Sequence, residues 1–207
     1  MIPHVYEDDY LLVLNKPAGI ATQGNDDLNE YTSKGWQPVH RLDQRVSGLI
    51  LFAKNVATNS ILQQAFAERK VVKIYKAIVA TAPSLPENKL THWLLKNAAL
   101  KKAKAYDKPI ENGKKAVLEY KLLQSSLKYH LLEIKLHTGR FHQIRAQLAA
   151  IGCPIVGDVK YGYKRTNTDA SIFLQSNCIS FQHPVTKETL AFQIPLPALW
   201  KKYGFED

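Results

Sequence analysis

Short apolar segments separated by polar turns dominate this chain and limit the folds that it can adopt. Such runs are typical of buried β-strands, particularly where β-branched residues accumulate as in VVKIYKAIVA. Strands are predicted in this way at residues 11–15, 49–53, 71–80, 116–123 and 129–137, and near 171–181 and 189–194. Period-two geometry in the third run places Tyr75 on one face with Lys73, Ala77 and Val79.

Helical spacing of apolar residues occurs in only two places. Residues 57–69 carry apolar side chains three and four positions apart, which predicts a helix. A second helix is predicted to begin near Thr138, a good N-cap residue, and to end at Gly152 and Pro154. Because strands outnumber helices and mostly do not alternate with them, the sequence predicts an α+β fold. We expect a largely antiparallel, mixed β-sheet with flanking helices.

The 207 residues contain no repeat, no low-complexity tract and no Ser/Gly-rich linker. A chain of this length can bury a substantial core, so we expect a single domain over residues 1–207. The polar stretch 20–38 is predicted to be a loop. We expect no separate N-terminal RNA-binding domain.

Positive charge is unevenly distributed along the chain. The net charge is +10, yet residues 1–38 hold two basic and six acidic residues, which leaves 26 basic and 12 acidic residues in 39–207. A body this basic favours a polyanionic partner such as nucleic acid. The stretch 96–115 alone has seven lysines and two acids. Those lysines suit backbone phosphates, although a solvated loop explains them equally well.

Several classes of location and site are disfavoured by the sequence. The two cysteines, Cys153 and Cys178, offer no disulfide framework and no paired metal-ligand spacing. The N-terminal apolar run is too short for a secretion signal or a membrane span. We therefore expect a cytoplasmic protein with no membrane partner, and take a monomer as the default state.

Three segments combine residue types that can carry chemistry: HRLDQRVSGLILFAK (40–54), KIYKAIV (73–79) and HTGRFHQIRAQLAAIGCPIVGDVKYG (137–162). Taken singly, each has an ordinary structural explanation. Arg41 and Asp43 could form a surface ion pair of negligible energy, and Tyr75 could be a core aromatic. Arg140, His142 and Arg145 could be a basic helix face.

Taken together and in this order, the three segments resemble the catalytic domain of the RluA-type pseudouridine synthase family. The opening DDYLLVLNKPAG looks like the first strand and turn of the same family, so the resemblance covers roughly residues 4–197. It implies an isomerase that converts a uridine of ribosomal or transfer RNA to pseudouridine at a central basic cleft. It also implies that no metal and no organic cofactor is needed.

The resemblance assigns roles to individual residues. Asp43 matches the essential aspartate of the family, Tyr75 its active-site tyrosine and Arg145 the basic residue that pairs with the aspartate. Arg41 matches an arginine that binds RNA and holds the target base out of the helix. The further candidates for RNA or substrate binding are His40, Arg140, His142 and Gln143. Gln147 stands at a position that is often histidine in the family.

The reaction explains why such residue types are wanted. Isomerisation breaks the N1–C1′ bond of uridine and rejoins the base through C5, so a carboxylate must attack or assist. Arg145 is expected to keep this carboxylate charged and to fix its direction. Tyr75 could stack on the base or move a proton. A stacked uridine is out of reach, which implies base extrusion or a loop target.

Other classes of function fit the sequence less well. The seven histidines show neither HxxxH nor HxH spacing, which disfavours a metal hydrolase. Ser47 lies in VSGL rather than in a GxSxG elbow, which disfavours a serine hydrolase. The strongest alternative is an RNA-binding protein without catalysis, such as a ribosome-assembly or folding factor. The intact set of Asp43, Tyr75 and Arg145 argues against it.

Overall fold

A computed structural model describes residues 2–23, 28, 32 and 35–206. Much of the predicted loop at 20–38 therefore lies outside the described residues. The chain forms two compact units, the first from residues 1–73 and 175–195 and the second from residues 74–174 and 196–207. Within the described residues, no helix is long and apolar enough to cross a membrane.

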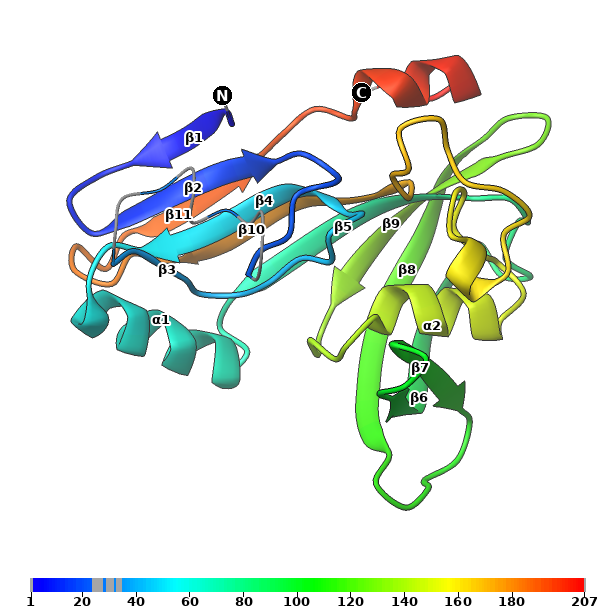
Figure 1. Cartoon of the computed structure of the whole chain (residues 1–207), viewed down its shortest axis with the longest axis horizontal. Coiled ribbons are helices and arrows are strands. Elements are labelled where there is room, and N and C mark those ends of the chain that lie inside the picture. The colour runs from blue at the N-terminus through cyan, green and yellow to red at the C-terminus, as the bar shows by residue number, and fades with distance from the viewer. Residues whose placement is uncertain (1, 24–27, 29–31, 33–34, 207) are drawn as a thin grey trace. The chain divides into compact units, whose positions relative to one another are not determined.

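The first unit is a β-sheet with one helix, α1, packed against it. Its strands are β1 (His4–Glu7), β2 (Leu11–Lys16), β3 (Gln37–Pro38), β4 (Ser47–Ala53), β10 (Leu174–Gln182, in this unit from Gln175 on) and β11 (Thr189–Gln193). They pair in the order β1-β2-β4-β10-β11, and β3 also pairs with β4. The contact between β4 and β10 is parallel and the other pairs are antiparallel. Helix α1 (Val56–Ala67) lies along one face of these strands (Figure 1).

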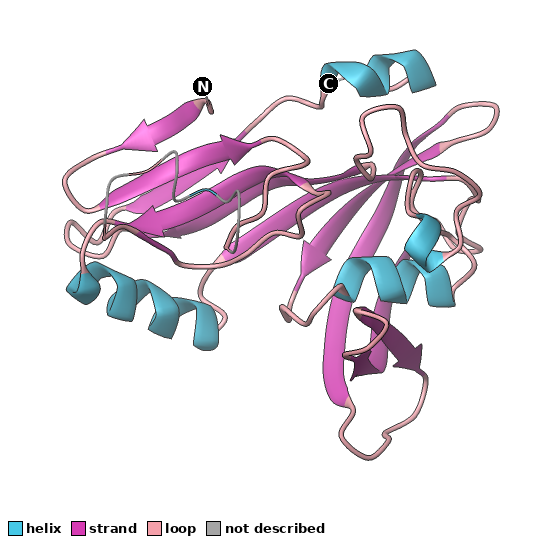
Figure 2. Ribbon diagram, viewed as in Figure 1, coloured by secondary structure: helices cyan, strands magenta, loops and turns pink. Residues whose placement is uncertain are grey.

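The second unit is an antiparallel β-sheet with one short α-helix and two 3-10 helices. Its strands are β5 (Val72–Val79, in this unit from Ile74 on), β6 (Glu87–Asn97), β7 (Lys102–Tyr106), β8 (Lys114–Ser125) and β9 (His130–Leu136). They pair in the order β5-β9-β8-β6-β7. Its helices are α2 (Gln143–Ala150) and the 3-10 helices η2 (Val159–Tyr161) and η3 (Ala198–Tyr203). Figure 2 shows how strands outweigh helices in both units, which confirms the predicted α+β class.

Each strand predicted from an apolar run is present, with bounds shifted by a few residues. The structure adds β1, β3, β6 and β7, which the sequence analysis missed; β3 lies at the end of the stretch 20–38 that was predicted to be a loop. Strand β6 reads ENKLTHWLLKN, where only Leu90, His92 and Leu94 are buried, so its inward face is too polar to stand out. Strand β7 lies inside the lysine-rich stretch 96–115, which is therefore part of a hairpin and not a loop alone.

The predicted start of the second helix at Thr138 is wrong. Helix α2 begins at Gln143, after His142, whose backbone adopts a left-handed conformation. The Thr138 hydroxyl is used elsewhere, because it accepts a hydrogen bond from the Val117 amide (2.9 Å) and donates to Gln143 Oε1 (2.7 Å). The threonine thus ties the segment before the helix to β8 and does not cap the helix.

Gly48 is required by the contact between β4 and β10. Its backbone has a φ of +116°, and a Cβ atom at this position would come within 2.3 Å of the Ser176 carbonyl oxygen. Any side chain would therefore push the two parallel strands apart. This explains the glycine in the SGL motif through packing, with no need for a role in chemistry.

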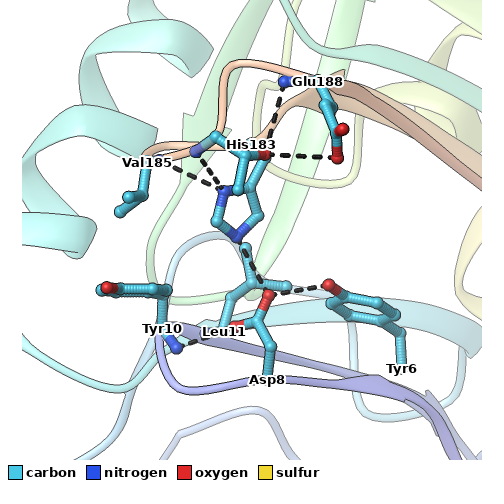
Figure 3. A network of polar contacts seen from close by, with 8 residues as sticks. Tyr6, Asp8, Tyr10, Leu11, His183, Val185 and Glu188 are labelled. Carbon is cyan, nitrogen blue, oxygen red and sulfur yellow. Dashed lines mark hydrogen bonds and ion pairs between the residues drawn. The ribbon is translucent and has the colours of Figure 1, made fainter.

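A polar network joins the β1–β2 turn to the β10–β11 turn in the first unit (Figure 3). The Asp8 carboxylate accepts hydrogen bonds from the Tyr6 hydroxyl and from the amides of Tyr10 and Leu11. His183 Nε2 lies 2.9 Å from Asp8 Oδ2, while its Nδ1 accepts from the amides of Val185 and Thr186. Because Nδ1 accepts, Nε2 must carry the proton that it donates to Asp8. The network is fixed in one tautomer.

This network shifts the pKa of the Asp8 carboxyl group and that of the Tyr6 hydroxyl. Burial raises the pKa of Asp8, but the hydrogen bonds donated by Tyr10, Tyr6, Leu11 and His183 outweigh it and lower the pKa overall. The hydrogen bond to Asp8, followed by burial, raises the pKa of Tyr6. The ionised carboxylate is therefore the form that the folded protein favours.

Replacing Asp8 by Asn is expected to lower the free energy of unfolding at pH 7 by about 1.5–3 kcal/mol, the range for hydrogen bonds to a charged group. A carboxyl group whose pKa is lower in the folded state than in the unfolded chain stabilises the fold at pH values above its unfolded-state pKa. This stabilisation is lost as the pH falls through the folded-state pKa. Urea denaturation from pH 7 to pH 3 should therefore show a shallower pH dependence for the variant. Asp9→Asn is the matched control, because Asp9 is exposed. Equal pH profiles for Asp8→Asn and the wild type would contradict this account.

Candidate functional site

Asp43 lies on a loop of the first unit that is held from two sides by the segment after β2. The buried Leu42 donates its amide to Thr22 Oγ1 (3.1 Å) and accepts from the same hydroxyl at its carbonyl (2.9 Å). The Gln44 carbonyl accepts from the Gly19 amide, and the Gln44 side chain donates to the Gly19 carbonyl. Asp43 itself closes a turn by accepting the Val46 amide at its carbonyl. These hydrogen bonds hold the loop that carries Asp43 in one conformation.

The buried Lys16 stabilises the same loop. Its side chain is 0% exposed, and its ammonium donates to the carbonyls of Pro17 (2.9 Å), Ile20 (2.8 Å) and Gln44 (3.3 Å). Burial lowers the pKa of Lys16 to about 8, and the negative charge of Asp43 acts in the opposite direction. The lysine of the NKPAG sequence is therefore a structural cation within electrostatic reach of Asp43.

The side chains around Asp43 differ in exposure. Asp43 is half-buried, whereas Arg41 and Arg45 are exposed. The side chain of His40 is engaged by the core of the unit: its Nε2 accepts a hydrogen bond from the Leu51 amide (3.2 Å), and its ring stacks on Phe66 of α1. Burial, together with the positive charge of Lys73, lowers the pKa of His40 to about 3, so the ring is neutral.

Tyr75 and Arg145 belong to the second unit. Tyr75 lies on β5 opposite Ile134 of β9 and is 7% exposed. Arg145 lies on α2, and its guanidinium makes a two-pronged contact with Asp158, through Nε to Oδ2 (2.7 Å) and Nη2 to Oδ1 (2.8 Å). Both side chains of this pair are buried. A planar guanidinium held by two parallel bonds has a fixed direction.

The segment before α2 is ordered by Gln143. Its Oε1 accepts from the Thr138 hydroxyl and the Arg140 amide, and its Nε2 donates to the Val117 carbonyl. Arg140 is exposed and donates from Nε to the Lys115 carbonyl (3.2 Å). His142 is half-buried and stacks on Phe141, with ring centroids 3.9 Å apart.

The hairpin formed by β6 and β7, together with the start of β8, carries uncompensated positive charge. Six of its lysines are exposed and Lys102 is half-buried: Lys96, Lys101, Lys102, Lys104, Lys108, Lys114 and Lys115. No ion pair joins any of these seven to a carboxylate of the described residues. Elsewhere in the unit, Lys76 and Lys89 are paired with Glu133 and Glu119.

The sequence-predicted site residues thus fall in two groups. Asp43, Arg41 and His40 share one loop of the first unit, while Tyr75, Arg140, His142, Gln143 and Arg145 belong to the second. The sequence analysis missed Lys16 and Asp158, although it quoted both within motifs. Their roles depend on burial and on partners distant in the chain, which a motif does not show. Across the described ranges, no three His, Cys, Asp or Glu side chains gather in a group that could hold a metal ion.

Comparison with known proteins identifies the family. Residues 10–150 match the RNA pseudouridylate synthase family. The chain belongs to this family. It is 38% identical over 205 residues to the ribosomal large subunit pseudouridine synthase C of Rickettsia felis, covering 93% of this chain and 67% of the relative. It is 35% identical over 217 residues to the uncharacterized RNA pseudouridine synthase YhcT of Bacillus subtilis, covering 94% and 68%.

Solved structures agree on the fold. Human RNA pseudouridylate synthase domain containing 1 superposes with a TM-score of 0.82 at 24% identity, covering 97% of this chain and 86% of that one. The family match and the named relatives, rather than this superposition, show that the enzyme is an RNA pseudouridine synthase, an isomerase, and they confirm the predicted family resemblance.

Replacing Lys16 by Met tests the buried cation through pH. In the wild-type enzyme the folded state releases the Lys16 proton near pH 8, whereas the unfolded chain keeps it until about 10.5. Between these values the unfolded state binds more protons, so wild-type stability rises with pH relative to the variant, by roughly 3 kcal/mol in total. Denaturation at pH 7, 8, 9 and 10 measures the difference.

The exposed Lys70 provides the control for this measurement, because its side chain is 73% exposed. Lys70→Met is expected to follow the wild-type pH profile. A constant difference between the wild type and Lys16→Met across this range would show that the ammonium does not titrate early.

Proposed function

We propose that Asp43 is the catalytic carboxylate with which this enzyme isomerises a specific uridine of ribosomal or transfer RNA, and that Tyr75 and Arg145 serve the same reaction. The observation that carries the proposal is the loop of Asp43, which hydrogen bonds hold in one conformation. It presents a half-buried carboxylate between the exposed Arg41 and Arg45. A surface ion pair would need no buried lysine beneath it, whereas a reacting group must be held in one direction before substrate arrives.

The reaction requires one bond to break and another to form at C1′. The N1–C1′ bond breaks, the base turns, C5 bonds to C1′, the proton leaves C5 and a proton is taken up at N1. The carboxylate of Asp43 can assist by attack on the base, by attack on the sugar or by a glycal route. Arg145, fixed in direction by Asp158, keeps positive charge available for an anion. Tyr75 stacks on the base or moves a proton.

RNA contacts are proposed for the exposed or half-buried cationic and aromatic side chains. Arg41 supports the extruded base, and Arg140 and His142 contact the RNA near the start of α2. His40 and Gln143 contribute indirectly, because their polar atoms are engaged with the Leu51 amide and with the Thr138–Arg140 segment. We infer that these two residues position the loops that carry the RNA-binding groups.

Large-subunit ribosomal RNA is the first substrate to test, because the Rickettsia relative is named for it. The proposal includes a monomer that acts in the cytoplasm as a single catalytic domain over residues 1–207. It also includes catalysis at a central basic cleft without a metal or an organic cofactor. These features extend the expectations drawn from the sequence.

Replacing Asp43 by Asn is expected to abolish pseudouridine formation while RNA affinity stays within about twofold, because the amide keeps the shape of the carboxylate but not its charge. Carbodiimide labelling with reverse-transcription stops measures the product on large-subunit and transfer RNA from cells lacking the gene. Asp9→Asn serves as the matched exposed control. Full activity of Asp43→Asn would overturn the assignment, and an inactive wild type on all cellular RNA would favour the non-catalytic RNA-binding alternative.

Replacing Lys101, Lys108 and Lys114 together by Gln should make RNA binding less sensitive to salt. Each phosphate contact contributes about 0.7–0.9 to the slope of log affinity against log salt, so the slope should fall by about two. The measurement is filter binding in a KCl series from about 50 to 300 mM, a range on the order of physiological ionic strength.

The matched control replaces Lys89, Lys121 and Lys135, which line a pocket of about 460 Å³ together with Glu87, Glu119 and Glu133. Cross-strand neighbours alternate in charge there, with Glu87 opposite Lys121 and Lys121 opposite Glu133. A charge-balanced face should not bind phosphate strongly, so this triple variant should keep the wild-type slope. Equal slopes for all three proteins would mean that lysines 101, 108 and 114 are merely solvated.

A further inference from the structure

Tyr161 connects the lysine-rich hairpin to the helix that carries Arg145. It ends η2 and is 6% exposed, and its ring packs with Leu94 and Ala103 of the hairpin and with Ala146 of α2. Alanines on the hairpin and on α2 let the two elements approach closely. Figure 1 shows α2 next to β6 and β7.

The hydroxyl of Tyr161 makes two specific contacts. It accepts a hydrogen bond from the Ala103 amide (2.8 Å) and lies 3.0 Å from His142 Nδ1. Strand β7 is the last strand in the order of its unit, so this amide has no neighbouring strand to bond. Whichever of the two groups donates, which the histidine tautomer decides, this hydrogen bond joins Tyr161 to the residue before α2.

The ring of Tyr161 lies beneath two cations from different elements. Lys102 Nζ of β7 is 5.0 Å from the ring centroid, and Arg145 Cζ of α2 is 4.9 Å from it. A second contact joins the same two segments, because Lys160 Nζ donates a hydrogen bond to the Lys101 carbonyl of the hairpin (3.2 Å). Cations over an aromatic face are attracted by its negative quadrupole, so the ring holds both in place.

We propose that Tyr161 is a positioning residue that fixes the lysine-rich hairpin and Arg145 in one arrangement, so that phosphate binding on the hairpin is coupled to the placement of Arg145. This inference rests on the proposed RNA contacts of the hairpin. The hydroxyl orders the hairpin through Ala103 and the start of α2 through His142, while the ring contacts the cations. The two parts of the side chain can therefore be removed separately.

Tyr161→Phe removes the hydroxyl and keeps the ring. It leaves the Ala103 amide without its acceptor, so KM for large-subunit ribosomal RNA should rise about tenfold, with kcat within about twofold of the wild type. Tyr161→Leu also removes the aromatic face and should lower kcat about tenfold in addition. Exchange of the Ala103 amide with deuterium should accelerate in both variants. A merely structural side chain would lower stability without this division between KM and kcat.

Tyr106→Phe is the matched control, because Tyr106 lies on the same strand with Lys104 over its ring (5.0 Å). It should leave KM, kcat and the Ala103 exchange rate unchanged. Wild-type KM and kcat in Tyr161→Phe would overturn the proposal, as would unchanged exchange at Ala103. Should the wild type form no pseudouridine, the proposed function fails by itself. RNA affinity then replaces KM, and a Tyr161→Phe affinity equal to that of the wild type overturns the coupling.

Discussion

The buried ammonium of Lys16 is the constraint on which the proposed site depends. A charge in a protein interior must be satisfied, and here three backbone carbonyls from two separate segments surround it. These contacts force the turn after β2 and the loop that carries Asp43 to lie together. Because Gln44 supplies one of the carbonyls, the backbone next to Asp43 cannot move without breaking one of the three hydrogen bonds of the ammonium. The position of the carboxylate is thereby tied to the core.

The second unit follows the same principle with different chemistry. Arg145 is buried and satisfied by a carboxylate, Asp158, and its guanidinium lies over the ring of Tyr161. In both units a buried cation is given a fixed set of partners, while other cations stay exposed. Arg41 and the six exposed lysines of the hairpin have the freedom that binding a flexible polyanion requires. Burial thus separates the structural charges from those proposed to bind RNA.

Charge pairing separates two surfaces of the second unit in a similar way. On the strands β5, β6, β8 and β9, lysines and glutamates face one another across the ladder, as at Lys76 and Glu133. At the hairpin the lysines lack such partners within the described residues. Cross-strand pairs cancel the field locally, so attraction for a polyanion is concentrated where pairing stops. This difference arises from strand register, which places acids next to some lysines only.

The sequence by itself determined the family, the α+β class, the strands with apolar runs and α1, because motif order and side-chain periodicity are local properties. It did not reveal β6 and β7, whose inward faces are too polar or too small to produce a clear pattern. It also placed the start of α2 at Thr138, a residue whose hydroxyl bonds to β8 instead. The tertiary structure alone decided the partners of Lys16, Arg145 and Tyr161. Buried polar groups are satisfied by whatever the fold brings near, and those neighbours are distant in sequence.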